Sequence, residues 1–387
     1  MFSKSIEFKN FKTYKKNLKV SNIWHQLLKD YKNKNQLLLS LSKKYRYSFN
    51  FKDLKSLKKY KEFQIFGMGG SSLGAKAIFC FLKRKIKNKF SFIDNISSNK
   101  LGKFDHKKFN IVISKSGNTL ETLVNFNSSR IKKNTIFITE NKKSYLRTLA
   151  QKLKSEIIDH NNFIGGRYSV LSETGMLPAF LMGLDPIKFK RLDYLIKDKN
   201  FINNLISNVS SLSNLHNQGK KNSIILNYDE NSKELFYWYQ QLVAESLGKA
   251  SKGILPIVSL VPKDNHSVMQ LYLDGFKNNF FTFFYVKERD FNKIDNSSLL
   301  KTHSFLKNKN TNDVLYAQFR ATESVFYKKK IPFRSIVVKK RDEKTLGELF
   351  TFFILETILL GKVLKLDPFN QPAVELIKKD TFKILQN

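Results

Sequence analysis

One stretch of the chain decides the fold: residues 63–74, which read FQIFGMGGSSLG. The apolar run 63–66 is typical of a buried strand, and the glycine-rich loop behind it leads into a helix-like pattern over 75–83. A strand that enters a helix through a glycine loop is a unit of open parallel sheets, in which ligands bind where the strands end. We therefore predict an α/β fold with its functional site beside this loop.

The same alternation of strand and helix continues on both sides of this stretch. Strands are predicted over 91–94, 110–114, 135–139 and 156–159, and again over 223–228, 254–261, 281–286 and 335–338. Helices are predicted over 174–183, 234–247, 345–364 and 372–385. This order predicts two doubly wound domains with mainly parallel sheets flanked by helices, plus helical termini. We place the boundary between Gly183 and Asn200, which gives domains 1–190 and 191–387.

The composition is that of a globular protein with a large surplus of lysine. The chain has 387 residues, of which 41% are hydrophobic, so it is long enough for two or three packed domains. Its 69 Lys and Arg exceed 32 Asp and Glu, which gives a net charge of +37. The lysines are spread along the chain beside many Asn, Ile and Phe residues, a pattern that base-composition drift produces. Without an arginine-rich, RNP or zinc-finger motif, we expect no nucleic-acid partner.

Cysteine use and hydropathy indicate a cytoplasmic protein. Cys80 is the only cysteine, which excludes a disulfide framework and a cysteine-rich metal site within one chain. Residues 1–9 alternate charged and apolar side chains and lack the apolar core of a signal peptide. The longest apolar run, 349–360, is too short to span a bilayer and contains Glu356. We expect it to form a buried helix, and we expect no membrane partner.

Two loops of the first half are suited to a phosphate group. In the first, three glycines allow a close backbone approach and two serines add hydroxyl donors. The second, 114–122, reads SKSGNTLET and follows a strand, and Asn118 with Glu121 resembles a capping box that starts a helix. The positive end of that helix dipole would face the loop. The candidate phosphate ligands are Gly70, Ser71, Ser114, Lys115, Ser116, Thr119 and Thr122.

Two other interpretations of these loops stay open. A glycine-serine loop is often only a tight turn that caps a helix. A dinucleotide site is a rival, since Gly67 and Gly69 begin its glycine pattern and Asp94 ends a plausible second strand. Ser72, however, occupies the place of the third glycine, and the second loop has no role in that scheme. The residues therefore favour a phosphate monoester over a dinucleotide.

The second half offers a candidate general base. Gln241 and Glu245 lie four residues apart on one face of a predicted helix, with Glu245 in the last turn before Gly248. A carboxylate at the negative end of a helix dipole is suited to accept a proton. The alternative is a solvated glutamate that pairs with Lys249 or Lys252.

Three further charged or titratable residues stand in suggestive places. His266 opens a predicted helix over 265–274, and Arg167 follows the glycine pair Gly165 and Gly166. Lys378 lies on the last predicted helix. Taken alone, a histidine such as His266 is more often structural or exposed, and Lys378 has the pattern of a solvated charge.

Taken in order, these segments resemble the phosphoglucose isomerase family. The resemblance runs from about residue 63 to residue 379 and rests on six motifs in the family's order. These motifs are GMGGSSLG at 67–74, ISKSGNTLETL at 113–123, GGRYSV at 165–170, AESLGK at 244–249, His266-Ser267, and VELIK at 374–378.

The resemblance implies an isomerase of glycolysis and gluconeogenesis that interconverts glucose 6-phosphate and fructose 6-phosphate, with two SIS-type domains. Glu245 would move a proton between C1 and C2, Arg167 would stabilise the enediol, and Gln241 would be a neighbouring hydrogen-bond partner. His266, assisted by Lys378, would open the sugar ring. The hydroxyls and ammonium of the two loops would hold the phosphate. The resemblance also implies a homodimer in which the histidine comes from the other subunit, and no metal or redox cofactor.

The chain departs from the family at a few positions without losing a proposed catalytic group. Ser116 stands where threonine is frequent and keeps the hydroxyl, and Ser72 replaces a frequent aspartate.

Two other functional classes stay open. A non-catalytic sugar-phosphate sensor would need the loops but not Glu245, and a nucleic-acid binder would use the lysine surplus.

Overall fold

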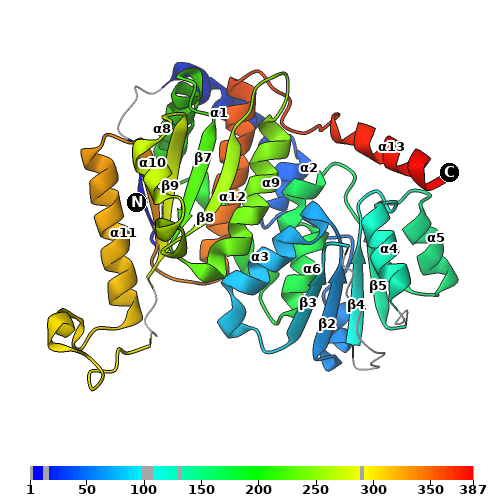
Figure 1. Cartoon of the computed structure of the whole chain (residues 1–387). Helices are drawn as coiled ribbons and strands as arrows, with labels where there is room; N and C mark the ends of the chain where they lie inside the picture. The colour runs from blue at the N-terminus through cyan, green and yellow to red at the C-terminus, as the bar shows by residue number, and fades with distance from the viewer. Residues whose placement is uncertain (1–2, 12–16, 97–107, 130–132, 288–291, 387) are drawn as a thin grey trace.

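The computed structural model describes residues 3–11, 17–96, 108–129, 133–287 and 292–386. Two five-stranded sheets lie in two units that meet through a layer of helices (Figure 1). The predicted α/β fold with two mainly parallel, helix-flanked sheets is therefore confirmed.

The first sheet is wholly parallel. Its strands stand in the order β3 (Lys89–Ile93), β2 (Glu62–Phe66), β4 (Lys108–Ile113), β5 (Thr135–Thr139) and β6 (Glu156–Asp159). The strand order reverses between β2 and β4, because the chain leaves β2 for β3 and then returns to the other side. Ligands of open α/β sheets bind at such a switch point. The loops after β2 and β4 are the two candidate phosphate loops.

Alternating side chains bury both faces of the first sheet. Ile111 and Ile113 of β4 pack on the face that α6 (Glu173–Leu181) covers, and Val112 packs on the face that α4 (Leu120–Ser128) and α5 (Tyr145–Lys152) cover. Helix α3 (Leu73–Phe81) follows the glycine loop and contacts α6. The sheet is thus held rigid beneath the loops at its carboxyl edge.

The second sheet repeats this order and adds one antiparallel edge strand. Its strands stand in the order β1 (Ile6–Lys9), β10 (Phe333–Val338), β9 (Asn279–Val286), β7 (Asn222–Asn227) and β8 (Leu255–Leu260). Only β1 is antiparallel; it pairs with β10, so a segment from the N-terminus joins the sheet of the second half. No sequence pattern predicted β1.

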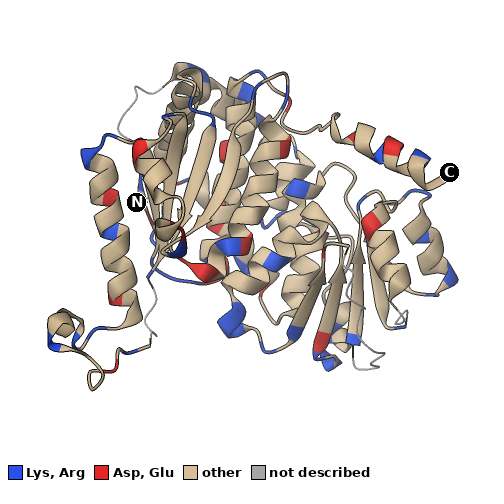
Figure 2. Cartoon of the chain, viewed as in Figure 1, with Lys and Arg blue, Asp and Glu red and all other residues tan. Residues whose placement is uncertain are grey.

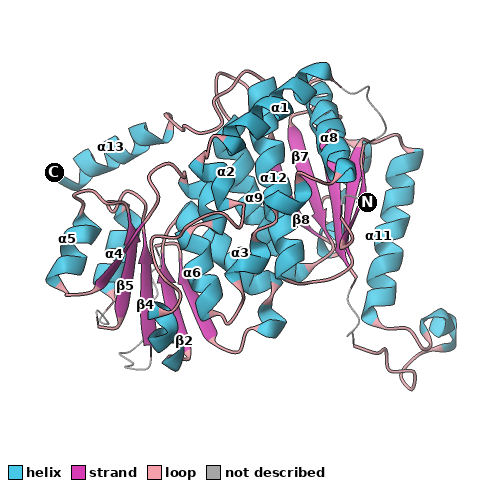
Figure 3. Cartoon of the chain, turned by 180° about the vertical axis from the view of Figure 1, so that it is seen from behind, coloured by secondary structure: helices cyan, strands magenta, loops and turns pink. Residues whose placement is uncertain are grey.

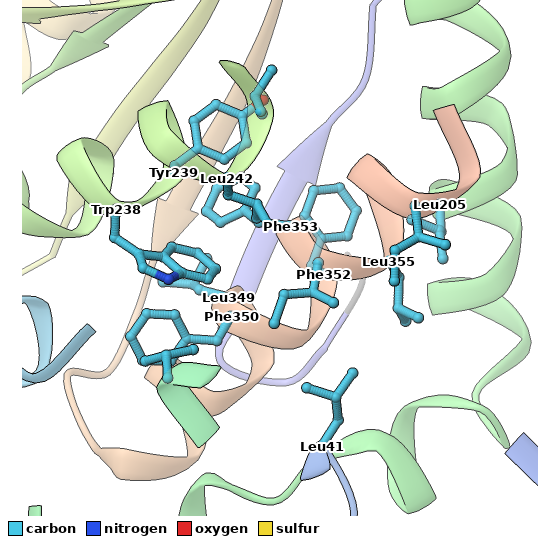
Figure 4. Close-up of a cluster of buried hydrophobic side chains, with 14 of the residues drawn as sticks. Leu41, Leu205, Trp238, Tyr239, Leu242, Leu349, Phe350, Phe352, Phe353 and Leu355 are labelled. Atoms are coloured by element: carbon cyan, nitrogen blue, oxygen red, sulfur yellow. The ribbon is translucent and has the colours of Figure 1, made fainter. Parts of the chain in front are cut away.

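The main core lies between the second sheet and the helices that join the two units. Helix α12 (Glu343–Val363) is buried over nearly its whole length and packs against α8 (Lys199–Asn217), α9 (Lys233–Leu247) and α1 (Leu18–Lys32). Figure 4 shows Trp238, Tyr239 and Leu242 of α9 facing Leu349, Phe350 and Phe353 of α12. The predicted buried helix over 349–360 is confirmed. Helix α3 of the first unit packs on α9, so the two units share this core.

The remaining helices are peripheral or short. Short helices α2 (Gln36–Ser40) and α7 (Leu192–Leu195) lie among the joining helices, and α10 (Met269–Asp274) and α11 (Thr311–Lys328) lie on the far side of the second sheet. Helix α13 (Val374–Gln386) extends away from the body, and none of its residues is buried (Figures 1 and 3).

Most predicted elements match the structure within two residues, and the segments over 135–139 and 156–159 match β5 and β6. The helix predicted over 265–274 ends at Asp274, before Gly275, as predicted, but its predicted start is wrong. His266 instead ends a 3₁₀ turn, Lys263–His266, and α10 begins only at Met269. Asp264 shapes this turn, because its carboxylate accepts hydrogen bonds from the Leu260 amide and the Ser259 hydroxyl.

Lys and Arg positions are scattered over both units (Figure 2). Across the described residues, no helix combines the length and the apolar character that a membrane crossing requires.

Candidate active site

The glycine loop brings three segments of the chain together. Gly69 adopts a left-handed φ of +52°, and a Cβ atom there would lie 2.6 Å from Nε2 of Gln241. A Cβ atom on Gly70 would lie 2.2 Å from the carbonyl group of Gly166. Gly70 must be glycine, because a Cβ atom there would clash with the Gly166–Arg167 backbone. At Gly69 the left-handed backbone favours glycine, and the missing side chain lets Gln241 approach the loop. Ser71 ends the 3₁₀ turn Gly69–Ser71 of this loop and is half-buried.

The hydroxyls of the second loop form one hydrogen-bonded cluster. Oγ of Ser114 lies 2.8 Å from Oγ1 of Thr119 and 3.5 Å from Oγ of Ser116, and it accepts a hydrogen bond of 3.1 Å from the Gly117 amide. The cluster sits where β4 ends and α4 begins, so the first amides of α4 face the same place. Hydroxyl donors, free amides and a positive dipole end are the features that hold phosphate groups.

The predicted capping box at this helix start is wrong. Thr119 is the N-cap residue and makes no side-chain capping bond. The Asn118 side chain instead accepts a hydrogen bond of 2.9 Å from the Tyr145 amide, which ties the loop to α5. The helix amides are therefore left to other acceptors, which suits a ligand site better than a capped helix would.

Two other predicted ligands complete this loop. Nζ of Lys115 donates to the carbonyl of Asn162 at 3.0 Å and lies 3.4 Å from Oε1 of Glu140. Thr122 is 1% exposed, and its hydroxyl has no hydrogen-bond partner among the described residues. A buried hydroxyl without a partner is costly, so an acceptor supplied by a ligand would stabilise it.

Arg167 lies at the centre of the site. It follows Gly166 in the 3₁₀ turn Gly166–Leu171 behind β6 and is 2% exposed. Its Nη1 donates to Oε2 of Glu245 at 3.2 Å and to Oε1 of Gln371 at 2.6 Å. The other three donors are held by Ser246 and by main-chain carbonyls of Pro368 and Asn370. All five guanidinium N–H groups are thus satisfied, which fixes the plane of the guanidinium.

Glu245 and Gln241 act as a pair on α9. Glu245 lies in the last turn of the helix, as predicted, and its side chain is 32% exposed. Oε1 of Glu245 accepts a hydrogen bond of 2.9 Å from Nε2 of Gln241. Glu245 is therefore paired with Arg167 rather than with Lys249 or Lys252, each of which donates to a main-chain carbonyl.

The residues that position Arg167 are not among those predicted from the sequence. Ser246 follows the candidate base directly, and its hydroxyl contacts both Nε of Arg167 and the Tyr168 hydroxyl, each at 2.8 Å. Pro368, Asn370 and Gln371 lie in the connection between α12 and α13. The run Asp367-Pro368-Phe369-Asn370-Gln371-Pro372 is rich in turn residues and could have drawn attention, but no local signal links it to Arg167.

The surroundings of Arg167 are dry and cationic. Burial raises the pKa of the Tyr168 hydroxyl, which donates to the carbonyl of Pro368 at 2.9 Å. Burial, and then the nearby Arg167 charge, lower the pKa of the Lys249 ammonium. A low dielectric strengthens the interaction of the guanidinium with any negative charge that develops beside it.

Within one chain, His266 lies away from the Arg167 cluster, by which we mean Arg167 with the side chains of Gln241, Glu245, Ser246 and Gln371. It is exposed and follows β8, whereas Glu245 precedes β8. The six residues of β8 rise roughly 3.3 Å each, which puts about 20 Å between the two ends of that strand. A single chain thus does not bring His266 to Glu245.

Lys378 also lies outside the cluster. It is on α13, its side chain is 67% exposed, and Nζ pairs with Oε1 of Glu375 at 2.7 Å. The structure thus brings together Gly70, Gln241, Glu245 and Arg167. The hydroxyl loop, residues 114–122, follows β4, which is the neighbour of the strand β2 that carries the glycine loop. His266 and Lys378 lie elsewhere.

The assembled groups can catalyse proton transfer on a phosphorylated substrate. A carboxylate that is partly open to solvent can accept and return a proton. The guanidinium beside it can stabilise a developing oxyanion, and the hydroxyl loop can hold a phosphate at a distance from the reacting carbons.

Comparison with protein families agrees with this site. The family model described as phosphoglucose isomerase matches residues 48–255, which include the two loops, Arg167 and Glu245. The chain is 32% identical over 364 residues to the glucose-6-phosphate isomerase of Methanocaldococcus jannaschii, covering 88% of each chain. It is 34% identical over 350 residues to that of Mycoplasmopsis pulmonis, covering 83% of this chain and 82% of the relative.

Solved structures share the fold at lower sequence identity. A hypothetical protein from Thermus thermophilus superposes with a TM-score of 0.80 at 22% identity over 95% of both chains. A glucose-6-phosphate isomerase from Chlamydia trachomatis superposes with a TM-score of 0.69 at 18% identity, covering 98% of this chain and 80% of that one. The arrangement of two helix-flanked sheets is therefore shared well beyond the range of sequence similarity.

Proposed function

The chain belongs to the phosphoglucose isomerase family, and on this premise we propose that it interconverts glucose 6-phosphate and fructose 6-phosphate, with Glu245 as the base. The observation that carries this assignment is the contact of 3.2 Å between Arg167 and Glu245 beside the glycine loop. A sensor that only binds a sugar phosphate would need the loops but would have no use for this pair.

The substrate phosphate would lie at the hydroxyl loop. Ser114, Ser116 and Thr119 would exchange hydrogen bonds among themselves for bonds to phosphate oxygens, and the buried Thr122 hydroxyl would gain an acceptor. Ser71 and Lys115 would add a donor each, and Gly70 would keep the loop backbone close. Binding of the phosphate would hold one end of the sugar, and C1 and C2 at the other end would thereby be oriented for the reaction.

The isomerisation itself would be a proton transfer. With the open-chain aldose bound, Glu245 takes the proton from C2, the electron pair forms the C1–C2 double bond, and the carbonyl oxygen on C1 becomes the enediol oxygen. Glu245 then returns the proton to C1 while the carbonyl forms at C2, and a hydroxyl proton passes between the two oxygens. Gln241 would hold the carboxylate in position through its hydrogen bond.

Arg167 would stabilise the enediol charge. Because all five of its donors are engaged, one must be released before it can bind the substrate oxygen. We assign this exchange to Nη1, since its partners are side chains that can rotate, whereas Nη2 donates to main-chain carbonyls. Glu245 would then be free to face the substrate carbons.

We propose that His266, one of the two ring-opening groups, acts in the site of a second subunit. His266 is exposed and distant from Glu245 in one chain, which supports its supply from the partner of a homodimer. Lys378 would reach the site through a movement of α13.

We also propose that the chain has two domains, 1–190 and 191–387, although β1 of the first joins the sheet of the second. The single cysteine supports a cytoplasmic location, which we also propose.

A coupled assay tests the assignment. The purified chain is given fructose 6-phosphate, and the glucose 6-phosphate formed is measured, with and without EDTA. We expect turnover in both conditions. Binding of fructose 6-phosphate without turnover would favour the sensor, and loss of activity with EDTA would show that a metal takes part.

A further inference from the structure

A cavity of about 410 Å³ lies at the amino edge of the second sheet, apart from the site described above. It is bounded by the end of α10, by the residues that follow α11, and by the residues before β7, β9 and β10. Both helices lie on the side of the molecule away from α13 (Figure 1). None of its lining residues belongs to the Arg167 cluster or to the two loops. Its size is that of a small-molecule site.

The cavity carries an excess of positive charge. Four lysines line it, Lys220, Lys277, Lys329 and Lys330, against one carboxylate, Asp274. Asp274 and the negative C-terminal ends of α10 and α11 offset part of this charge. Four lysines outnumber them, so the lining keeps a positive excess that favours an anionic ligand.

A buried donor in the same cavity lacks an acceptor. Asn279, the first residue of β9, is 4% exposed and lines the cavity. Its Oδ1 accepts a hydrogen bond of 2.9 Å from Asn222, but its Nδ2 has no partner among the described residues. Nζ of Lys220 is held at the rim by a hydrogen bond of 2.7 Å to the carbonyl of Lys277. A ligand oxygen beside Asn279 would satisfy the orphaned donor.

The rest of the lining is apolar and partly aromatic. Tyr272, Phe276, Ile331 and Pro332 line the cavity, and the Phe276 side chain is 55% exposed. A sugar phosphate would leave its hydroxyls unpaired against such a wall. A flat aromatic ring would instead bury apolar surface and stack on Phe276.

We propose that this cavity binds a nucleoside monophosphate, with its phosphate among the lysines and Asn279 and its base against Phe276. The site is independent of the isomerase site, so it stands or falls separately from the proposed function.

Calorimetric titration with AMP tests the proposal. We expect saturable one-to-one binding to the wild type, at least a tenfold loss of affinity in Lys277→Gln/Lys329→Gln, and no change in the matched variant Lys29→Gln/Lys32→Gln on α1. Phe276→Ala should weaken AMP binding while leaving the weak binding of inorganic phosphate unchanged. The variant Ser114→Ala/Thr119→Ala should bind AMP as the wild type does, since it alters only the isomerase loop.

Three results would overturn the proposal. They are equal AMP affinity in wild type and Lys277→Gln/Lys329→Gln, loss of AMP binding in Ser114→Ala/Thr119→Ala, and inorganic phosphate binding as tightly as AMP. Far-ultraviolet circular dichroism of every variant checks that each is folded as the wild type is.

Discussion

Nη1 of Arg167 lies 3.2 Å from Oε2 of Glu245, although 78 residues separate them and they belong to different units of the fold. The contact joins the segment that follows β6 to the last turn of α9. In the free protein it keeps the proposed base beside the proposed oxyanion partner. In the exchange proposed above this contact opens when substrate binds, while the bonds of Nε and Nη2 keep the guanidinium in place.

Glu245→Gln should remove most of the turnover but leave binding of the sugar phosphate intact. The amide keeps the shape and can still accept from Gln241, but it cannot take a proton. We expect kcat to fall by roughly 10² to 10⁴ or more in the coupled assay. Glu230→Gln, an exposed glutamate ahead of α9, is the control. Turnover unchanged in Glu245→Gln would remove the mechanism.

Ser114→Ala with Thr119→Ala should weaken substrate binding. The two hydroxyls bond each other, so removing both leaves neither orphaned in the free protein. Each lost bond to a charged phosphate costs roughly 1.5 to 3 kcal/mol of binding free energy. Calorimetry with fructose 6-phosphate measures this loss, and Ser128→Ala at the exposed end of α4 is the control. Equal affinities would show that the loop does not hold the phosphate.

Two inactive variants should complement each other if His266 serves the partner subunit. Glu245→Gln and His266→Asn are expected to be poorly active when expressed alone. In a mixed population half of the dimers are heterodimers with one intact site of two, so about a quarter of wild-type activity should return. Co-expression with two different affinity tags allows the heterodimer to be purified. Its failure to regain activity would place the histidine outside the partner's site.

Arg167→Lys should impair catalysis and loosen the connection between α12 and α13. Lysine keeps the charge but cannot make five directed bonds, so the carbonyl of Asn370 loses its guanidinium donor and that of Pro368 keeps only the Tyr168 hydroxyl. We expect kcat to fall by about 10²-fold and limited proteolysis between residues 364 and 374 to speed up. Arg320→Lys on α11 should do neither, and an unchanged proteolysis rate in Arg167→Lys would contradict the positioning role.

Acid should destabilise the fold partly through His160, which is 2% exposed and lies after β6. Burial lowers the pKa of its imidazole to about 4. The unfolded chain takes up this proton at its ordinary pKa of about 6.5, so the free energy of unfolding should fall as the pH drops from 6.5 to 4. The contribution is at most about 3 kcal/mol. Urea unfolding at several pH values should show that the free energy of unfolding falls less steeply with pH in His160→Gln than in the wild type. The variant His25→Gln, at an exposed histidine, is the control. Equal slopes for His160→Gln and the wild type would refute this.

Local signals predicted the strands and loops of the site well. The apolar runs at β2, β5 and β6 are bounded by glycine or polar residues, and a strand is specified largely by such neighbours. Local signals misled at Asn118 and at the start of the helix near His266. The Asn118 side chain accepts a hydrogen bond from the Tyr145 amide rather than capping its own helix. His266 ends a 3₁₀ turn in which the Asp264 carboxylate bonds the Leu260 amide before the turn.

The sequence by itself determined that two parallel sheets would form, that hydroxyl-rich loops would end two strands of the first, and that Glu245 would stand in a final helical turn. Only the tertiary structure decided what these groups meet. The pairing of Arg167 with Glu245 and Gln371, the packing of Gly69 against Gln241, and the separation of His266 from Glu245 depend on contacts between distant parts of the chain. Such contacts arise from packing of the shared core, which no local pattern encodes.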